Sequence, residues 1–327
     1  MSDLIHWGIL GTGAIARKFA AGLQTTPGAK LLAVGSRTQA TAEEFGRQFD
    51  IPHRHPTYEA LVNDPVVDAI YIATPHSCHQ ENALLALSAG KPVLVEKPFA
   101  INAAQAETVI RAACAKKLLV MEAMWTRFIP LHVHLRQMLR EGIIGPVRLL
   151  RADFGFQAAP ATNPRLFDPA LGGGALLDVG VYPISLASMV FGPPARVTGM
   201  ARLGVTRVDE QDAMVFSHPQ GELALLSCAI TLNTTLDATL IGERGFIRIH
   251  PPFWKSKAMT VTLDDGSEQV LEFPYEGNGY QFEALEFQAL LRSRQTESPA
   301  MPLDESLSIM KTLDALRAQW GVKYPMD

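Results

Sequence analysis

The chain has 327 residues, of which 47% are hydrophobic and 19% are charged, so its composition is typical of a globular protein and excludes disordered and collagen-like chains. This length predicts two domains. The formal net charge of −4 gives no electrostatic basis for binding nucleic acid or an anionic membrane, so we expect a small-molecule ligand.

The three cysteines, none of them in a C-x-x-C pair, favour a reduced cytoplasmic location over a disulfide framework or a zinc ribbon. The first residues lack the basic start and long apolar run of a secretory signal. The best candidate for a membrane span, residues 4–14, is interrupted by polar residues and glycines, so we expect none.

Up to about residue 123, short apolar runs alternate with longer stretches of helical period. This rhythm is typical of repeated βαβ units and predicts an α/β Rossmann domain, a doubly wound parallel sheet, over residues 1–123. The expected strands are 5–10, 31–35, 69–73, 92–95 and 118–122.

Beyond residue 124 the pattern changes to a series of alternating strands, which predicts an α+β domain with a large open, mainly antiparallel sheet over residues 124–327. Helices are expected at 131–141, after 174, at 280–292 and at 303–320. The expected strands are 147–154, 197–203, 213–217, 223–232, 237–241, 246–249, 259–263 and 269–273.

A glycine-rich turn follows the first expected strand directly and opens a helix. Its residues are Gly11, Thr12, Gly13, Ala14, Ile15 and Ala16, in the pattern G-x-G-x-x-A. The first glycine permits a tight turn, the second allows the backbone to approach a pyrophosphate, and the small residue permits close helix packing. The alternative is a turn that only joins a strand to a helix. The place of this glycine-rich turn in the first βαβ unit favours a dinucleotide site over that alternative.

The end of the second expected strand indicates which dinucleotide binds. An acidic residue there would accept hydrogen bonds from an adenosine ribose, but residues 30–42 contain no carboxylate. Ser36 and Arg37 offer a hydroxyl and a guanidinium instead, which favours the 2′-phosphate of NADP. Use of both NADP and NAD is the main alternative.

The third and fourth expected strands end in polar residues at the carboxyl edge, where a doubly wound sheet binds its ligand. We expect these residues near the nicotinamide, with Lys97 moving a proton or stabilising an alkoxide. They are Ala73, Thr74, Pro75, His76 and His79 after one strand, and Glu96 and Lys97 after the other.

The histidines do not predict a metal site. His76 and His79 have no third ligand at a suitable spacing, so hydrogen bonding to cofactor or substrate is the favoured interpretation. His53 and His55 stand in a loop flanked by prolines, and that pair does not resemble a site either.

The second half of the chain offers candidates for substrate binding. Asp178 and Tyr182 are four residues apart and would share one helix face, with Tyr182 exchanging a proton with a substrate hydroxyl. A buried structural tyrosine is the alternative. Trp125 and Phe154 would provide apolar walls for a ring, and Arg127 a donor, although core aromatics are common.

With these residues in place, the chain resembles the glucose-fructose oxidoreductase / inositol dehydrogenase (Gfo/Idh/MocA) family over essentially its whole length. The motifs are the glycine turn, the run 73–79, the run 89–98 and the run 173–180. The resemblance implies an NAD(P)-binding Rossmann domain, a catalytic Lys97, and oligomerisation through the sheet of the second domain.

Two positions narrow the resemblance. Many family members have His where this chain has Tyr182, and many have Asn in place of His76, which argues against inositol dehydrogenase chemistry. Tyr182 and the run 121–128 look like the branch of dimeric trans-dihydrodiol dehydrogenases and NADP-dependent D-xylose dehydrogenases. That branch pairs a lysine with a tyrosine and surrounds a ring substrate with aromatics, matching Trp125 and Phe154.

We therefore predict an NADP-dependent oxidoreductase of a cyclic polyol, sugar or trans-dihydrodiol, forming a homodimer or higher homo-oligomer. Lys97 and Tyr182 would form the acid–base pair, with His79 and Asp178 helping to place the substrate. Two alternatives remain: a keto- or anhydro-sugar reductase that uses the same residues, and a non-catalytic NADP-binding sensor or scaffold.

Overall fold

The computed structural model describes residues 4–327. The contacts divide the chain into two compact units, each described separately below. The first unit contains the residues up to Ala100, Ala104–Phe128 and Glu276–Ser306. The second contains Ile101–Ala103, Ile129–Tyr275 and Leu307–Asp327.

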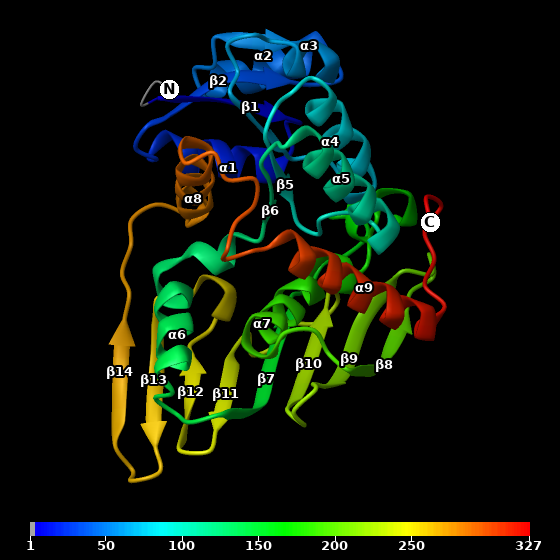
Figure 1. Cartoon of the computed structure of the whole chain (residues 1–327). Coiled ribbons are helices and arrows are strands. Elements are labelled where there is room, and N and C mark those ends of the chain that lie inside the picture. Colours follow the sequence, from blue (N-terminus) through cyan, green and yellow to red (C-terminus); the bar gives the residue numbers. More distant parts are fainter. Residues whose placement is uncertain (1–3) are drawn as a thin grey trace. The chain divides into compact units, whose positions relative to one another are not determined.

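The first unit is built on a six-stranded parallel sheet in the order β3-β2-β1-β4-β5-β6 (Figure 1). This order reverses beside β1, as in a doubly wound Rossmann sheet, and confirms the predicted α/β domain. The strands are β1 (Ile5–Leu10), β2 (Ala29–Gly35), β3 (His53–His55), β4 (Ala69–Ile72), β5 (Val93–Glu96) and β6 (Val120–Ala123). The helices are α1 (Ala14–Gln24), α2 (Gln39–Gln48), α3 (Tyr58–Val62), α4 (His79–Ser88), α5 (Ala103–Lys116) and α8 (Tyr280–Arg292).

The structure adds one strand that the sequence pattern did not predict. Residues 53–55 were expected to form a loop, but His53–His55 is the edge strand β3, paired in parallel with β2 from Ala33 to Gly35. Three residues are too few for an alternating pattern to show, so this strand is defined by its pairing partner rather than by its own sequence.

Helix α8 belongs to the first unit, although the sequence pattern placed all of 124–327 in the second domain. Trp7 of β1 is fully buried, and its ring centroid lies 5.5 Å from that of Phe19 and 5.1 Å from that of Phe287 in α8. The Asn278 amide also donates to the Lys18 carbonyl oxygen at 2.7 Å. Burial of these aromatics brings Glu276–Ser306 back to the Rossmann sheet, so a single division at 123/124 does not describe this unit.

The second unit is built on an eight-stranded sheet in the order β14-β13-β12-β11-β7-β10-β9-β8. Its pairs are antiparallel except for β7 and β10, which run parallel, so the predicted mainly antiparallel sheet is confirmed. The strands are β7 (Val147–Gly155), β8 (Arg196–Leu203), β9 (Asp209–Ser217), β10 (Leu223–Ala229), β11 (Ala238–Gly242), β12 (Gly245–Ile249), β13 (Ala258–Leu263) and β14 (Glu268–Glu272).

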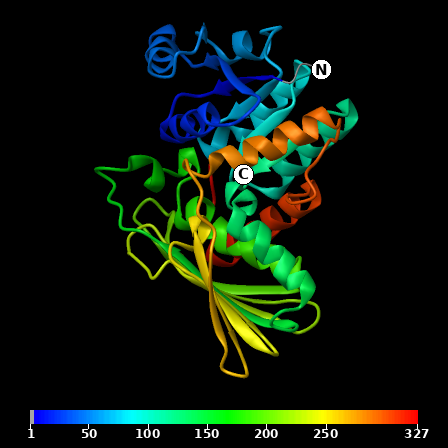
Figure 2. The ribbon, with the colours of Figure 1, turned by 90° about the vertical axis from the view of Figure 1, so that its left-hand side faces the viewer.

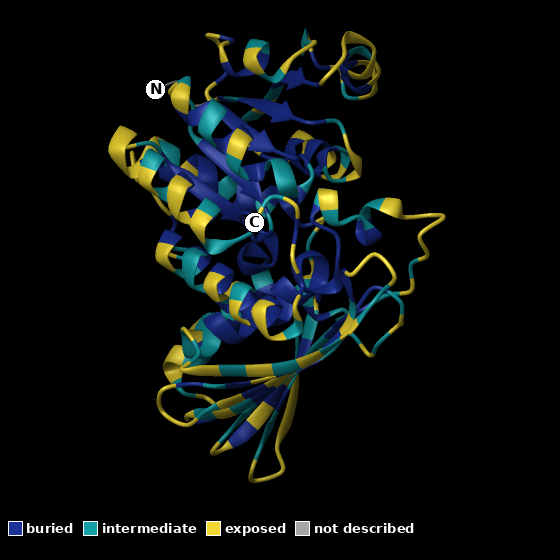
Figure 3. Ribbon diagram, turned by 90° about the vertical axis from the view of Figure 1, so that its right-hand side faces the viewer, coloured by how far each residue is buried: buried dark blue, intermediate teal, exposed yellow. Residues whose placement is uncertain are grey.

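Helices cover one face of this sheet and leave the other to solvent (Figure 2). They are α6 (Pro130–Glu141), α7 (Val181–Phe191) and α9 (Leu303–Trp320). Exposed and buried residues alternate along the strands, as in β12, where Phe246 is 40% exposed between buried neighbours (Figure 3). This alternation is expected of a sheet with one buried and one open face.

One helical segment, Pro169–Phe191, is long and apolar enough to cross a membrane by length and composition alone. It differs from the run 4–14, which was the best candidate for a span in the sequence. Of its most apolar window, 83% is buried inside the protein, and Ile184 and Leu186 are almost fully covered. Burial to this extent is typical of a helix in the core of a protein.

Candidate active site

The glycine turn after β1 has the geometry that a pyrophosphate site requires. Gly11 has a φ of +106°, and a Cβ there would lie 2.9 Å from the Ala73 carbonyl oxygen, so only glycine fits without strain. Gly13 caps α1 in extended conformation and is exposed, and a Cβ on it would meet nothing within 4 Å. The space beside Gly13 is therefore open at the N-terminus of α1, the end of a helix whose N–H groups can bind a phosphate.

Ser36 and Arg37 lie at the end of β2, as predicted. The Ser36 hydroxyl is buried and lies 2.6 Å from Thr41 Oγ1 and 3.4 Å from Thr12 Oγ1, which links this strand end to the glycine turn. The Arg37 side chain is exposed. A hydroxyl and a cation beside the glycine turn are suited to hold a phosphate on an adenosine ribose.

His79 connects the loops that follow β4 and β5. Its fully buried ring places Nδ1 at 2.8 Å from the Pro98 carbonyl oxygen and Nε2 at 3.0 Å from the Thr74 carbonyl oxygen. The Thr74 hydroxyl in turn accepts a hydrogen bond from the Asn82 amide at 3.1 Å. His79 therefore holds backbone in place, and the prediction that it contacts cofactor or substrate stays a prediction, as does that for His76.

Lys97 follows a buried carboxylate. Glu96 is 3% exposed, accepts a hydrogen bond from the Tyr71 hydroxyl, and lies 3.2 Å from the Lys97 backbone nitrogen through Oε2. Burial, together with the charge of Glu96, raises the pKa of Tyr71 well above its ordinary range. Burial and the same charge also raise the pKa of Glu283 well above its usual value. Neither Tyr71 nor Glu283 was predicted from the sequence.

The segment Trp125–Phe128 also lies in the first unit and is buried. The Trp125 ring stacks on Tyr280 with centroids 4.7 Å apart, and the Arg127 guanidinium donates to both carboxylate oxygens of Glu305 at 2.6 and 3.1 Å. These contacts give both residues a structural role in this unit. Their predicted contacts with substrate stay predictions.

In the second unit, Phe154, Tyr182 and Trp254 form an aromatic cluster. Phe154 of β7 stacks on Trp254 with centroids 3.5 Å apart and planes 9° from parallel. The Tyr182 ring lies 5.3 Å from that of Phe154 and 6.4 Å from that of Trp254. Trp254 was missed because it stands in a short 3-10 turn between two strands, where no periodic pattern marks it.

Asp178 forms an ion pair with Arg165, whose Nη2 lies 2.7 Å from Asp178 Oδ1. Asp178 belongs to a π-helical turn, Leu176–Gly180, and α7 begins immediately after it with Val181 and Tyr182. The sequence predicted one regular helix here, with the two side chains four residues apart on one face. A π turn changes that angular relation, and such turns are frequent at functional sites.

The cofactor candidates that the sequence predicted after β1, β2, β4 and β5 all lie in the first unit, because the carboxyl ends of parallel strands meet at one edge of a sheet. Phe154, Asp178 and Tyr182 all lie in the second unit. The first unit therefore carries a sheet edge of the kind that binds dinucleotides. The second unit carries the aromatic cluster and the ion pair of Asp178 with Arg165.

Comparison with known proteins identifies the class. Residues 5–124 match the model of an oxidoreductase family with an NAD-binding Rossmann fold, and residues 132–248 match the GFO/IDH/MocA C-terminal domain. The chain belongs to the GFO/IDH/MocA family of oxidoreductases. The predicted family, fold class and nicotinamide-type cofactor are confirmed.

Full-length relatives narrow the comparison. The chain is 35% identical over 332 residues to human trans-1,2-dihydrobenzene-1,2-diol dehydrogenase, covering 99% of each chain. It is also 35% identical over 335 residues to the mouse protein of the same name, again covering 99% of each. These relatives agree with the branch that the sequence motifs resemble.

Solved structures of similar fold include a ketoreductase and an aldose oxidoreductase. A 3-ketoreductase from Actinomadura kijaniata in complex with NADP and TDP-benzene superposes with a TM-score of 0.85 at 28% identity, covering 96% of this chain and 97% of that one. An aldose-aldose oxidoreductase from Caulobacter crescentus, complexed with glycerol, has a TM-score of 0.87 at 26% identity, covering 95% and 96%. The predicted enzyme class, an oxidoreductase acting on CH–OH groups, is confirmed.

Proposed function

We propose that this protein transfers hydride between the CH–OH carbon of a cyclic diol, polyol or sugar and the nicotinamide of NADP. The observation that carries the proposal is the polar edge of the first unit, where the glycine turn, Ser36 and Lys97 follow β1, β2 and β5 of one parallel sheet. Relatives named as dihydrodiol dehydrogenases, and structural neighbours named as a 3-ketoreductase and an aldose-aldose oxidoreductase, support the same reaction class.

The preference for NADP is inferred from the end of β2. Ser36, hydrogen-bonded to Thr41, and the exposed guanidinium of Arg37 provide donors for a 2′-phosphate, and residues 30–42 carry no competing carboxylate. The open space at Gly13 leaves the N-terminus of α1 accessible to the pyrophosphate. These residues fit the cofactor, which supplies the hydride acceptor when it is bound.

Lys97 and Tyr182 are assigned the proton transfer. An oxidised carbinol must lose its hydroxyl proton as hydride leaves the carbon, and a lysine and a phenol are groups that can accept and relay it. The buried Glu96 and the ring of His79 hold the backbone on either side of Lys97. Phe154 and Trp254 support the Tyr182 ring and provide an apolar surface suited to a ring substrate.

The reverse reaction, reduction of a keto-sugar, uses the same groups in the opposite protonation order. The neighbour named as a 3-ketoreductase favours it as the second candidate. Oxidation and reduction are distinguished by following the reduced-nicotinamide absorbance with NADP plus diols or sugars, and with NADPH plus keto-sugars. Binding of NADP without turnover on either set would favour the sensor alternative.

The direct test replaces Lys97 with methionine, which has a similar length and no amine. NADP binding should survive, and turnover with the best diol or sugar should fall by a factor on the order of 10²–10⁴. The control is Lys116→Met, an exposed lysine at the C-terminal end of α5 that is not among the proposed site residues. Full activity of the Lys97 variant would contradict the assignment of proton transfer to Lys97.

The open face of the second unit is the proposed oligomer interface. Met200, Val215, Leu225, Phe246 and Val270 are exposed on its strands, with Met200 82% exposed. Side chains of this size on one sheet face are suited to pairing with the same face of a second copy. Light scattering at micromolar concentration should give twice the chain mass or more, and a monomer would refute the interface.

A further inference from the structure

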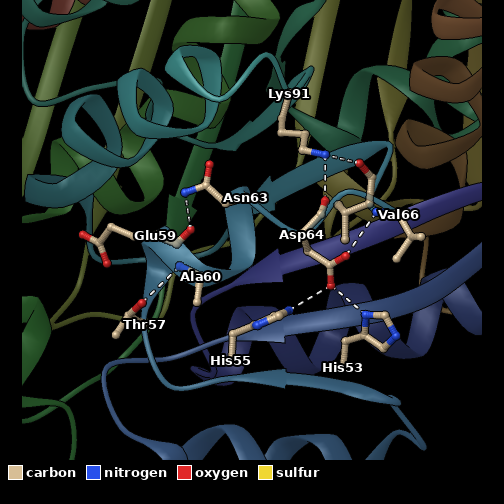
Figure 4. Close-up of polar contacts among 10 residues, drawn as sticks. His53, His55, Thr57, Glu59, Ala60, Asn63, Asp64, Val66 and Lys91 are labelled. Atoms are coloured by element: carbon tan, nitrogen blue, oxygen red, sulfur yellow. Dashed lines mark hydrogen bonds and ion pairs between the residues drawn. The ribbon is translucent and has the colours of Figure 1, made fainter.

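Two histidines and a buried aspartate lie together in the first unit (Figure 4), and none of the three is assigned to cofactor or substrate. His53 Nδ1 lies 2.6 Å from Asp64 Oδ2, and His55 Nε2 lies 2.9 Å from the same oxygen. All three ligand atoms fall within 4.8 Å of one another. The three residues form one set of two imidazoles and a carboxylate.

The fold accounts for this arrangement. His53 and His55 are two residues apart on β3, so their side chains leave the same face of the strand. β3 is the edge strand of its sheet, which leaves that side accessible. Asp64 comes from the turn after α3, eleven residues beyond His53. The sequence placed His53 and His55 in a loop flanked by prolines and did not mark them as a site, because only the fold brings this carboxylate to them.

Asp64 is held so that one oxygen faces the imidazoles. Its Oδ1 accepts a hydrogen bond from the Val66 N–H at 3.1 Å. Lys91 Nζ donates to the Asp64 and Val67 carbonyl oxygens at 2.8 and 2.7 Å, which fixes the turn from the other side (Figure 4). A carboxylate already oriented by such partners loses little freedom when it binds an ion.

Access and donor chemistry suit a transition metal. The side chains of His53 and His55 are 39% and 22% exposed, whereas that of Asp64 is 4% exposed. The set is therefore open on the imidazole side and anchored on the carboxylate side. Two imidazoles and one carboxylate favour Zn²⁺, Co²⁺ or Ni²⁺ over Mg²⁺ or Ca²⁺, which prefer oxygen ligands.

The geometry points to a metal-binding site formed by His53, His55 and Asp64, with water completing the coordination. Zinc bonds of roughly 2.0–2.1 Å in tetrahedral geometry separate neighbouring ligand atoms by about 3.3 Å. Each imidazole nitrogen, now 2.6 or 2.9 Å from the Asp64 oxygen, therefore has to move away from it, and the two nitrogens, which lie within 4.8 Å of each other, have to adopt the same separation. The ion would join the edge strand β3 to the turn after α3.

This site is structural rather than catalytic, since none of its ligands is assigned to cofactor or substrate. It nevertheless lies close to the cofactor edge, because the His55 carbonyl oxygen accepts a hydrogen bond from the Ser36 N–H at 3.2 Å. The inference does not depend on the proposed function, and its test measures binding and stability rather than turnover.

The test titrates tag-free, EDTA-treated protein with Zn²⁺ by calorimetry and with Co²⁺ by visible absorption. We expect one ion per chain with micromolar affinity or better, and a rise of the melting temperature with Zn²⁺. His53→Ala and His55→Ala should each weaken binding roughly tenfold or more, and the double variant should show no Zn²⁺-dependent rise. Asp64→Asn should weaken binding as well.

His6→Ala is the matched control, because His6 pairs with Asp68 at 3.2 Å in the same unit but has no second imidazole in the pair. This variant should bind as the unaltered chain does. Binding that persists in the double variant would place the ion elsewhere and overturn the inference. Absence of saturable binding in the unaltered chain would overturn it too, leaving a hydrogen-bonded His–Asp–His cluster.

Discussion

His79 and Pro98 are joined by a hydrogen bond of 2.8 Å between the imidazole Nδ1 and the Pro98 carbonyl oxygen. The other ring nitrogen lies 3.0 Å from the Thr74 carbonyl oxygen, so one buried ring connects the loops after β4 and β5. Lys97 precedes Pro98 directly. The backbone that carries the proposed catalytic amine is therefore held by a histidine eighteen residues earlier.

We predict that His79→Ala lowers kcat by about tenfold while the KM for NADP changes little, since the variant loosens the Lys97 backbone rather than removing a ligand. A neutral imidazole donates from one ring nitrogen, so at least one carbonyl oxygen loses its donor at a cost of about 1–3 kcal/mol, and the melting temperature should fall as well. His79→Gln, which can donate to one carbonyl oxygen, should recover part of the loss in kcat and part of the loss in melting temperature. A variant that melts lower but keeps full kcat would reduce His79 to a purely structural residue.

Tyr182→Phe removes the phenol hydroxyl and keeps the ring beside Phe154 and Trp254. If this hydroxyl carries a proton, kcat should fall by a factor on the order of 10²–10⁴ with the melting temperature nearly unchanged. Steady-state kinetics and thermal unfolding on the same preparations check this. Phe154→Leu is the companion variant, which should raise the KM for a ring substrate more than it lowers kcat.

Arg37→Ala should weaken NADP binding on the order of 10- to 100-fold, because a charge-assisted bond to the 2′-phosphate is lost, and leave NAD binding nearly unchanged. Fluorescence titration with both reduced cofactors measures the ratio. Arg111→Ala is the control, since that exposed arginine pairs with Glu107 on α5. Equal losses for the two cofactors would contradict a specific contact with the 2′-phosphate.

The buried pair Asp209 and Asp212 predicts a pH dependence of stability. Burial and the charge of Asp209 raise the pKa of Asp212 to about 9, whereas an unfolded aspartate titrates near ~3.9. Between these pH values the folded chain binds more protons than the unfolded chain, so this group lowers the free energy of unfolding as the pH rises.

The asparagine of Asp212→Asn cannot ionise, so this variant should not lose free energy of unfolding through this group as the pH rises. We expect the melting temperature of the variant to match that of the unaltered chain near pH 4–5 and to exceed it increasingly towards pH 9. Asp264→Asn, in an exposed turn, should show no such trend. If the melting temperatures of Asp212→Asn and of the unaltered chain changed in parallel with pH across this range, that result would count against a protonated Asp212.

Local sequence patterns determined the strands other than β3, the glycine turn and the class of enzyme. The tight turn predicted from the run Gly11 to Ala16 depends on a first glycine that can adopt a positive φ, and Gly11 has that conformation. Alternating burial along β8 to β12 follows equally directly from residue order, because successive side chains on a strand face opposite sides.

Tertiary structure alone decided which residues meet across long separations. Phe287 returns to Trp7, Trp254 stacks on Phe154, and Asp64 reaches His53 and His55, although no periodicity links these positions. Periodicity reports the face on which a side chain lies within one element and carries no information about its partner on another. The pairing depends on burial and hydrogen bonding within the folded chain, which exist only once the elements have packed together.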